Sequence, residues 1–112
     1  MKMIIAYIAP FKLDAVRDAL KQTGISGLSA GSIQGFGRQA GHTETYRGME
    51  YEVDMVPKTR IEILVDDTLA PVVISTIEQT ARTGSIGDGK IAVLPVEDVI
   101  RIRTGERGRD AL

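Results

Sequence analysis

Four short apolar stretches alternate with two helix-periodic stretches, and this order limits the folds open to the chain. Three of these stretches are short and rich in β-branched residues, which favours strands, whereas residues 28–34 are a weaker strand candidate that contains Gly31. The predicted strands cover residues 3–8, 28–34, 60–65 and 90–96, and the predicted helices cover residues 12–24 and 66–84. The order is therefore βαββαβ, the ferredoxin-like arrangement of the α+β class.

The helices are recognised by apolar residues every three or four positions and by residues typical of helix ends. We expect Asp66, Asp67 and Thr68 to cap the second helix, and Gly24 and Gly84 to end the two helices. The apolar positions are Leu13, Val16 and Leu20 in the first helix and Val73, Ile77 and Ala81 in the second.

Length and composition indicate one soluble domain. The chain has 112 residues, a formal net charge of −1 and no cysteine. The near-neutral charge argues against a nucleic-acid partner, and the lack of cysteine removes disulfides and thiolate chemistry. No signal-peptide pattern opens the chain, and no apolar run approaches the ~20 residues that cross a bilayer. We therefore expect an intracellular protein.

Two helices can cover only one face of such a sheet, yet the predicted strands carry apolar residues on both faces. In the first strand Ile4, Ala6 and Ile8 alternate with Ile5 and Tyr7. An uncovered apolar face usually marks an interface. We predict self-association, and a modest exposed patch is the alternative.

The connection between the second and third predicted strands, residues 36–59, is long and rich in glycine and charge. Compact domains rarely contain loops beyond ~15 residues unless these are functional or disordered. Its centre, around Tyr46 to Tyr51, does not suit a core, so function is expected here. His42, the single histidine, has no cluster at metal-ligand spacing and is interpreted as polar surface.

The sequence TGSIGDGK, residues 83–90, places Gly84, Gly89 and Lys90 on the spacing of a phosphate-binding P-loop. Ile91 stands where that motif needs Ser or Thr, and a predicted strand follows instead of a helix. Glycines can still turn successive N–H groups toward one point and bind an anion. A phosphate cradle and a hairpin turn with an incidental lysine both fit this pattern.

Arg101 and Arg103 alternate near the end of the chain. In an extended segment they point to the same side, which suits a polyphosphate; a solvated charge pair is the alternative. No Ser/His/Asp or Cys/His set can be assembled. A non-enzymatic sensor is therefore preferred over a small phosphotransferase or ATPase, and an adaptor that binds no ligand is the third hypothesis.

From residue 1 to residue 112, the chain resembles the PII nitrogen regulatory signal transduction proteins. The resemblance lies in PFKLDAV near the start, GFGRQAGHTETYRGMEYEVD in the long connection, PKTRIEI after it, TARTGSIGDGKI, and RIRTGERGRDAL at the end. It implies a single PII domain, residues 1–112, that forms a homotrimer. Within it are a partner-binding T-loop at about 37–55, a phosphate-binding loop at about 82–90 and a C-terminal segment at about 101–112.

The resemblance implies that ATP and ADP compete for clefts between subunits. Arg101 and Arg103 match the pair that reaches the phosphates, whereas residues 27–29 match the stretch that touches the base. The implied nucleotide-binding residues are Gly27, Leu28, Ser29, Gly35, Phe36, Gly37, Arg38, Gln39, Glu62, Leu64, Gly87, Asp88, Gly89, Lys90, Arg101 and Arg103.

The implied effector is 2-oxoglutarate, bound through Mg²⁺ on the ATP phosphates with Gln39 as the metal ligand. The matching 2-oxoglutarate residues are Gln39, Ala40, Gly41 and Lys58, of which Lys58 pairs with the distal carboxylate. Because ADP lacks the γ-phosphate that completes the metal site, 2-oxoglutarate is expected to bind only alongside ATP. Ala9 and Ala40 stand where relatives commonly have Arg and Lys, so weaker effector binding is expected.

The resemblance also implies a non-enzymatic regulator with protein partners. In the family the extended loop plugs ammonium transporter channels with its central arginine, here Arg47, and it contacts other nitrogen-metabolism regulators. Tyr51 matches the position that a uridylyltransferase or adenylyltransferase modifies in many relatives, whereas Met49 replaces a serine that some relatives phosphorylate. A cytoplasmic protein, recruited to the inner membrane through a channel partner, is therefore expected.

Overall fold

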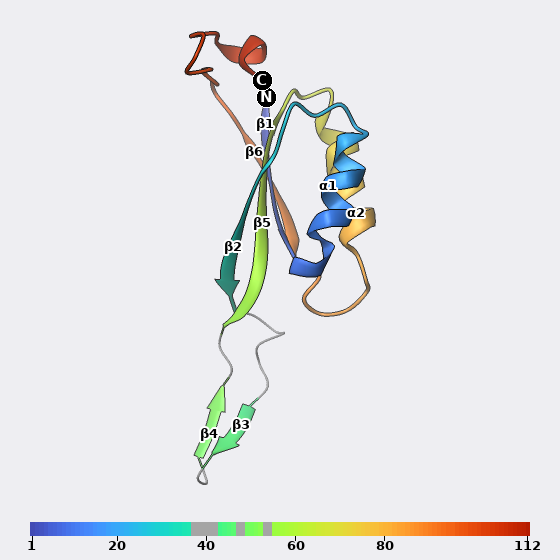
Figure 1. The fold of residues 1–112 in the computed structure, drawn as a ribbon, viewed down its shortest axis with the longest axis vertical. Helices are drawn as coiled ribbons and strands as arrows, with labels where there is room; N and C mark the ends of the chain where they lie inside the picture. Colours follow the sequence, from blue (N-terminus) through green and yellow to red (C-terminus); the bar gives the residue numbers. More distant parts are fainter. Residues whose placement is uncertain (37–42, 47–48, 53–54) are drawn as a thin grey trace.

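A four-stranded antiparallel sheet and two helices make up the body of the chain (Figure 1). The computed structural model describes residues 1–36, 43–46, 49–52 and 55–112, with the backbone alone described for the two stretches between 43 and 52. The strands are β1 (Lys2–Ile8), β2 (Ser29–Gly35), β5 (Val56–Val65) and β6 (Lys90–Pro95), in the spatial order β2-β5-β1-β6. Every neighbouring pair is antiparallel, which confirms the ferredoxin-like fold of the α+β class.

Both helices, α1 (Leu13–Lys21) and α2 (Ala70–Ala81), lie on the same side of the sheet (Figure 1). A 3₁₀ turn, η1 (Pro10–Lys12), leads into α1, and another, η3 (Gly108–Ala111), lies near the end of the chain. The core forms between the helices and the sheet, from the buried residues Ile4, Ala6, Ile8, Val16, Leu20, Ile61, Ile63, Val65, Ala70, Val73, Ile77 and Ala81.

The sheet face opposite the helices, called the open face below, carries the alternate residues of each strand. Ile5 and Tyr7 are only partly buried, whereas Ile4, Ala6 and Ile8 of the same strand are at most 1% exposed. This alternation confirms the two-faced pattern predicted for the first strand. The strand register places Met3, Ile5, Tyr7, Arg60, Glu62, Leu64, Ala92 and Leu94 together on the open face.

The expected capping of the second helix is wrong in detail. Helix α2 begins at Ala70, and Leu69 occupies the cap position without a side-chain hydrogen bond. The backbone carbonyl of Asp66 accepts hydrogen bonds from the N–H groups of Leu69 and Ala70, and its side chain accepts one from the Thr68 hydroxyl. The three residues Asp66–Thr68 thus form a turn before the helix. Helix α2 also ends earlier than predicted, at Ala81 and not at Gly84.

The connection between the second and third predicted strands is shorter than expected. Strand β5 begins at Val56 because its first residues pair with the end of β2, Val56 lying opposite Gly35. Within the connection, β3 (Thr43–Tyr46) and β4 (Met49–Glu52) form a separate two-stranded antiparallel sheet. Figure 1 places this hairpin beyond the ends of β2 and β5, far from the two chain termini.

Candidate functional site

The glycine-rich loop between α2 and β6 is folded closely against the first strand. Gly89 has a φ of +97°, and a Cβ atom at this position would lie 1.5 Å from the carbonyl oxygen of Tyr7. Gly87 also has a positive φ, +103°. An L side chain rarely adopts such angles. The absence of a side chain at Gly89 therefore allows the loop to return to β1, and both glycines allow backbone angles that other residues rarely adopt.

Asp88 holds the loop in this shape. Its carboxylate accepts hydrogen bonds from the backbone N–H groups of Thr83, at 2.7 Å, and Gly84, at 2.8 Å, and from the Thr83 hydroxyl. The Thr83 hydroxyl is the largest cause of a pKa for Asp88 below its ordinary value of 3.8. The side chain of Asp88 is thus occupied within the loop, while the backbone of the same residue remains part of the predicted phosphate cradle.

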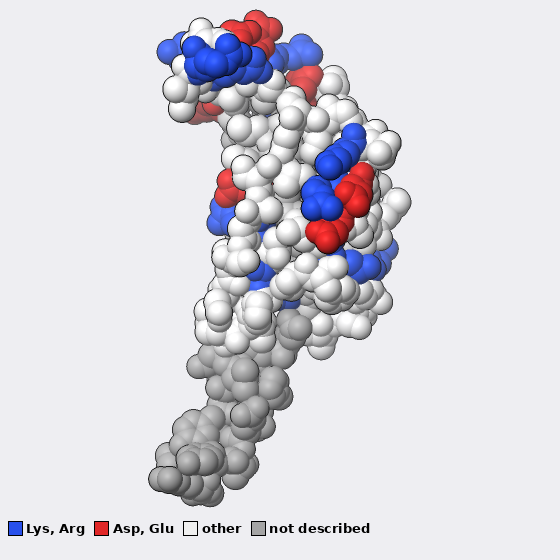
Figure 2. Space-filling model, in the orientation of Figure 1, with Lys and Arg blue, Asp and Glu red and all other residues white. Residues whose placement is uncertain are grey.

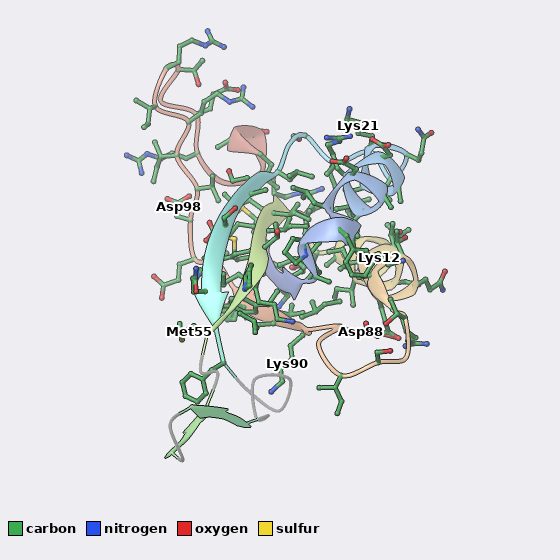
Figure 3. All side chains as sticks on the ribbon, turned by 60° about the horizontal axis from the view of Figure 1, so that its bottom comes forward. Lys12, Lys21, Met55, Asp88, Lys90 and Asp98 are labelled. Carbon is green, nitrogen blue, oxygen red and sulfur yellow. The ribbon has the colours of Figure 1, made fainter. Side chains whose placement is uncertain are left out.

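A cavity of about 650 Å³ lies beside this loop, at the end of the sheet that carries Met55 and Lys90 (Figure 3). It is lined by Tyr7, Ile33, Gly35, Phe36, Val56, Lys58, Ile86, Gly87, Gly89 and Lys90. Lys58 Nζ donates a hydrogen bond of 2.6 Å to the Gly87 carbonyl oxygen and so ties β5 to the glycine loop. The structure therefore gathers two cationic side chains and the glycine loop around one cavity.

Several of these lining residues were not among the predicted site residues. Tyr7, Ile33 and Ile86 contribute side chains to the cavity. The alternation of apolar residues in the first predicted strand already placed Tyr7 on the face away from the helices, so the sequence could have identified it as a site residue. Ile86 is 67% exposed, and an apolar residue inside a polar glycine loop is the signal that could have identified it.

A second group of predicted site residues lies at the other end of the open face. Ser29 pairs with Glu62 across β2 and β5, and Leu64 follows two positions later on the same face. Glu62 lies 2.8 Å from Arg60, whose guanidinium is over the Tyr7 ring. Ser29 and Gly35 are the two ends of β2, and a rise of ~3.3 Å per residue separates them by roughly 20 Å. Gly27 and Leu28 precede this strand.

The two predicted phosphate-binding arginines do not lie in an extended segment, so that part of the prediction is wrong. A turn at residues 102–104 follows Arg101, whose carbonyl oxygen accepts a 2.8 Å hydrogen bond from the Gly105 N–H. The Arg101 guanidinium contacts Glu106 Oε1 at 3.1 Å and the Leu112 backbone oxygen at 3.0 Å. Arg101 and Arg103 lie beyond β6, at the opposite end of the sheet from the glycine loop (Figure 1).

Some predicted site residues lie outside the described part of the chain. They are Gly37, Arg38, Gln39, Ala40, Gly41 and Arg47; His42, interpreted as polar surface, lies outside it as well. Tyr51, the predicted modification site, lies on β4, where it is paired with Glu44.

Among residues 1–36 and 55–112 with the short strands between them, no three His, Cys, Asp or Glu side chains are grouped as metal ligands. No helix within the described part of the chain is long and apolar enough to span a membrane.

Comparison with known proteins gives consistent matches over the whole chain. The sequence model of the family described as nitrogen regulatory protein P-II matches residues 1–106. The chain is 57% identical to the nitrogen regulatory protein P-II of Azospirillum brasilense and 55% identical to that of Rhodospirillum rubrum, over the full length of both chains. It is 56% identical to nitrogen regulatory protein P-II 1 of Escherichia coli K12, again over both full lengths.

Proposed function

This chain belongs to the nitrogen regulatory protein P-II family, and we propose that it senses ATP, ADP and 2-oxoglutarate. Family membership makes it a signal transduction protein of nitrogen regulation and not an enzyme, with small-molecule effectors and nitrogen-metabolism regulatory targets.

The cavity beside the glycine loop carries the proposal. Its volume of about 650 Å³ lies within the roughly 300–1,000 Å³ typical of small-molecule sites. Lys58 and Lys90 supply positive charge, and Gly87 and Gly89 line the cavity with backbone alone. Phosphate groups are recognised by such a combination of lysine and glycine-rich backbone. We assign the phosphates of ATP or ADP to this end of the sheet.

The separation of the predicted residues supports a site shared between copies of the chain. Lys90 and Pro95 are the two ends of β6, which places them roughly 17 Å apart at ~3.3 Å per residue. Arg101 lies farther along the chain, so one copy does not bring Lys90 and Arg101 to the same phosphate group. A second copy, packed on the open face, would supply the missing arginines. A homotrimer with nucleotide between its subunits satisfies this requirement.

Lys58 links the nucleotide to the proposed effector. Its ammonium group has three donors, and one of them bonds to Gly87 in the glycine loop. We propose that Lys58 pairs with the distal carboxylate of 2-oxoglutarate, next to Ala40 and Gly41. Gln39 would be an oxygen ligand of the Mg²⁺ ion that arrives with the ATP phosphates. Such an ion accepts neutral oxygen ligands alongside phosphate.

The long connection, residues 37–55, is proposed as the partner-binding T-loop. Its hairpin of β3 and β4 lies at the same end of the sheet as the proposed nucleotide site (Figure 1). We propose that Arg47 enters an ammonium transporter channel and that Tyr51 is the target of a uridylyltransferase or adenylyltransferase. The protein would then act in the cytoplasm and reach the inner membrane through its channel partner.

Calorimetric titration tests the nucleotide site. The Lys90→Ala variant should lose roughly 1.5–3 kcal/mol of ATP binding free energy, the range for a hydrogen bond to a charged group. Lys21→Ala removes an equal charge from the exposed end of α1 and is the matched control. Equal ATP affinity in wild type and Lys90→Ala would contradict the assignment of the loop.

The effector is tested by titrating 2-oxoglutarate into the protein with Mg-ATP and, separately, with Mg-ADP. Binding is expected only in the first case, and Gln39→Glu should weaken it while leaving ADP affinity unchanged. Equal 2-oxoglutarate binding by Gln39→Glu and wild type would remove Gln39 from the metal site. A protein that captures its partner without any nucleotide response would be an adaptor.

A further inference from the structure

The C-terminal segment, residues 101–112, folds back on itself. The backbone of Ile100 forms an antiparallel bridge with Arg107, and the Arg101 N–H donates a 2.9 Å hydrogen bond to the Glu106 carbonyl oxygen. The Gly108 N–H donates to the Val99 carbonyl oxygen, also at 2.9 Å. In Figure 2, this part of the molecule carries a dense group of basic and acidic side chains. The segment is thus a defined substructure and not a free tail.

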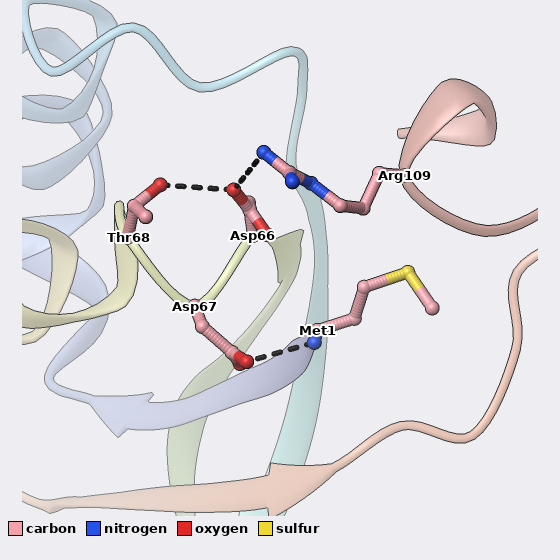
Figure 4. Close-up of polar contacts among 5 residues, drawn as sticks. All are labelled: Met1, Asp66, Asp67, Thr68 and Arg109. Carbon is pink, nitrogen blue, oxygen red and sulfur yellow. Dashed lines mark hydrogen bonds and ion pairs between the residues drawn. The ribbon is translucent and has the colours of Figure 1, made fainter.

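A polar contact joins the segment to the body of the protein. Arg109 donates a 2.8 Å hydrogen bond to Asp66 Oδ2, which also accepts a 2.9 Å bond from the Thr68 hydroxyl (Figure 4). The Asp66 side chain is only 23% exposed. Its pKa lies below the ordinary value, first because of the Thr68 hydrogen bond and further because of the Arg109 charge. The sequence predicted that Asp66 caps α2. In the structure its carboxylate instead binds Arg109 and the Thr68 hydroxyl.

An open cleft with polar as well as apolar walls lies beneath part of the segment. A cavity of about 470 Å³ lies between the segment and the body, lined by Arg109, Asp110 and Leu112 on one side and by Ile25, Leu64 and Leu69 among the residues on the other. Where side chains leave such a space, dispersion contacts are lost. The Arg109–Asp66 contact therefore has a larger share in holding the segment than it would over a packed interface.

The position of Arg101 depends on this attachment. Its guanidinium bonds to the backbone oxygen of Leu112, and the Leu112 N–H bonds to the carbonyl oxygen of Arg109. A continuous series of contacts thus leads from Asp66 through Arg109 and Leu112 to Arg101. Glu106 Oε1 contacts the other terminal nitrogen of the same guanidinium at 3.1 Å.

We propose that Asp66 and Arg109 are positioning residues that fasten the C-terminal segment so that Arg101 is held ready for a nucleotide phosphate. This inference rests on the proposed function, in which Arg101 serves a nucleotide bound between copies of the chain. Without the contact, the segment has more freedom to lose when the nucleotide binds, and preorganised groups bind more tightly because that cost is already met. Neither residue is expected to touch the nucleotide itself.

The test uses Arg109→Gln, with Lys21→Gln as a control that removes the same charge from the exposed end of α1. Arg109→Gln should weaken ATP binding about two- to fivefold, which corresponds to the loss of an exposed ion pair. The exchanged pair Asp66→Arg with Arg109→Asp should recover most of this loss. Lys21→Gln should bind ATP as the wild type does, with all three variants folded by circular dichroism.

Hydrogen exchange gives a readout that a nucleotide contact would not change. In nucleotide-free protein, the amides of Arg101, Gly105 and Gly108 should exchange faster in Arg109→Gln than in wild type, and the exchanged pair should slow them again. Unchanged ATP affinity in Arg109→Gln, or no recovery in the exchanged pair, would overturn the positioning role alone. A wild-type protein that binds no ATP would overturn the proposed function as well.

Discussion

Replacing Gly89 by alanine tests how the glycine loop is fitted to the first strand. At this position the backbone has a φ of +97°, and a Cβ atom would lie 1.5 Å from the carbonyl oxygen of Tyr7 and 2.7 Å from its carbonyl carbon. Gly84 of the same loop is a matched control. Its φ is +87°, but nothing lies within 4 Å of the added Cβ. The two substitutions therefore share the backbone strain and differ in the collision.

The expected magnitudes follow from this difference. Placing an L residue at such a φ costs about 1–2 kcal/mol, and this should be the whole loss of unfolding free energy for Gly84→Ala. In Gly89→Ala the new Cβ must also retreat from 1.5 Å to beyond 3.4 Å, where ordinary contact begins. That movement disrupts the pairing of Tyr7 with Lys90 at the end of β6, and losing a backbone hydrogen bond costs about 0.5–1.5 kcal/mol.

Urea unfolding of both variants measures the difference in unfolding free energy. Gly89→Ala should be less stable than Gly84→Ala by about 0.5–1.5 kcal/mol, and its ATP affinity should fall further because Lys90 moves with the loop. Equal losses of stability in the two variants would refute the close fit between loop and strand.

Two further predictions concern Asp88 and the shared site. The pKa of Asp88 is lowered in the folded chain, first by the Thr83 hydroxyl, so its stabilising contribution is present above the ordinary pKa of 3.8 and is lost as pH falls through the lower folded value. Wild type should therefore lose more thermal stability than Asp88→Asn below pH ~4, and parallel curves would contradict this. If each nucleotide lies between two copies, refolding Lys90→Ala and Arg101→Ala together at equal amounts should restore tight ATP binding in about a quarter of the sites, assuming random cyclic assembly. Calorimetry that finds no tight sites in the mixture would contradict a shared site.

The fold could be predicted from the sequence where the deciding interactions are local. Alternation in residues 3–8 identified both faces of β1, and helical spacing identified the buried positions of α2. The start of β5 was missed, because Pro57 argues against a central strand. In the structure Pro57 pairs with Gln34 of β2, while β1 reaches only as far as Thr59. Pro57 therefore lies where β5 has a single neighbour.

The candidate site was predictable in its residue types but not in its arrangement. Glycine spacing indicated a phosphate loop, yet the contact between Lys58 and Gly87 joins residues 29 positions apart and has no local signal. The same holds for Asp66, whose partner Arg109 is 43 positions away. Local rules assigned Asp66 to a helix cap and Arg101 to an extended segment, because both rules consider only neighbours in the sequence. In the structure the Asp66 carboxylate binds Arg109 from across the fold, whereas Arg101 precedes a turn and contacts Glu106 and Leu112 within its own segment.

A site distributed over both ends of the sheet, as proposed here for a P-II protein, would have a thermodynamic consequence. If the glycine loop of one copy and the C-terminal segment of another hold the same nucleotide, nucleotide binding and assembly are linked, and each must strengthen the other by the same free energy. The glycine loop is held by Asp88 and by its fit to Tyr7, whereas the C-terminal segment is held by Arg109 and Asp66. Each half is thus ordered by contacts within its own chain. Association then aligns two surfaces that are already ordered. It therefore loses less conformational entropy than it would if both loops had to be ordered at the same time.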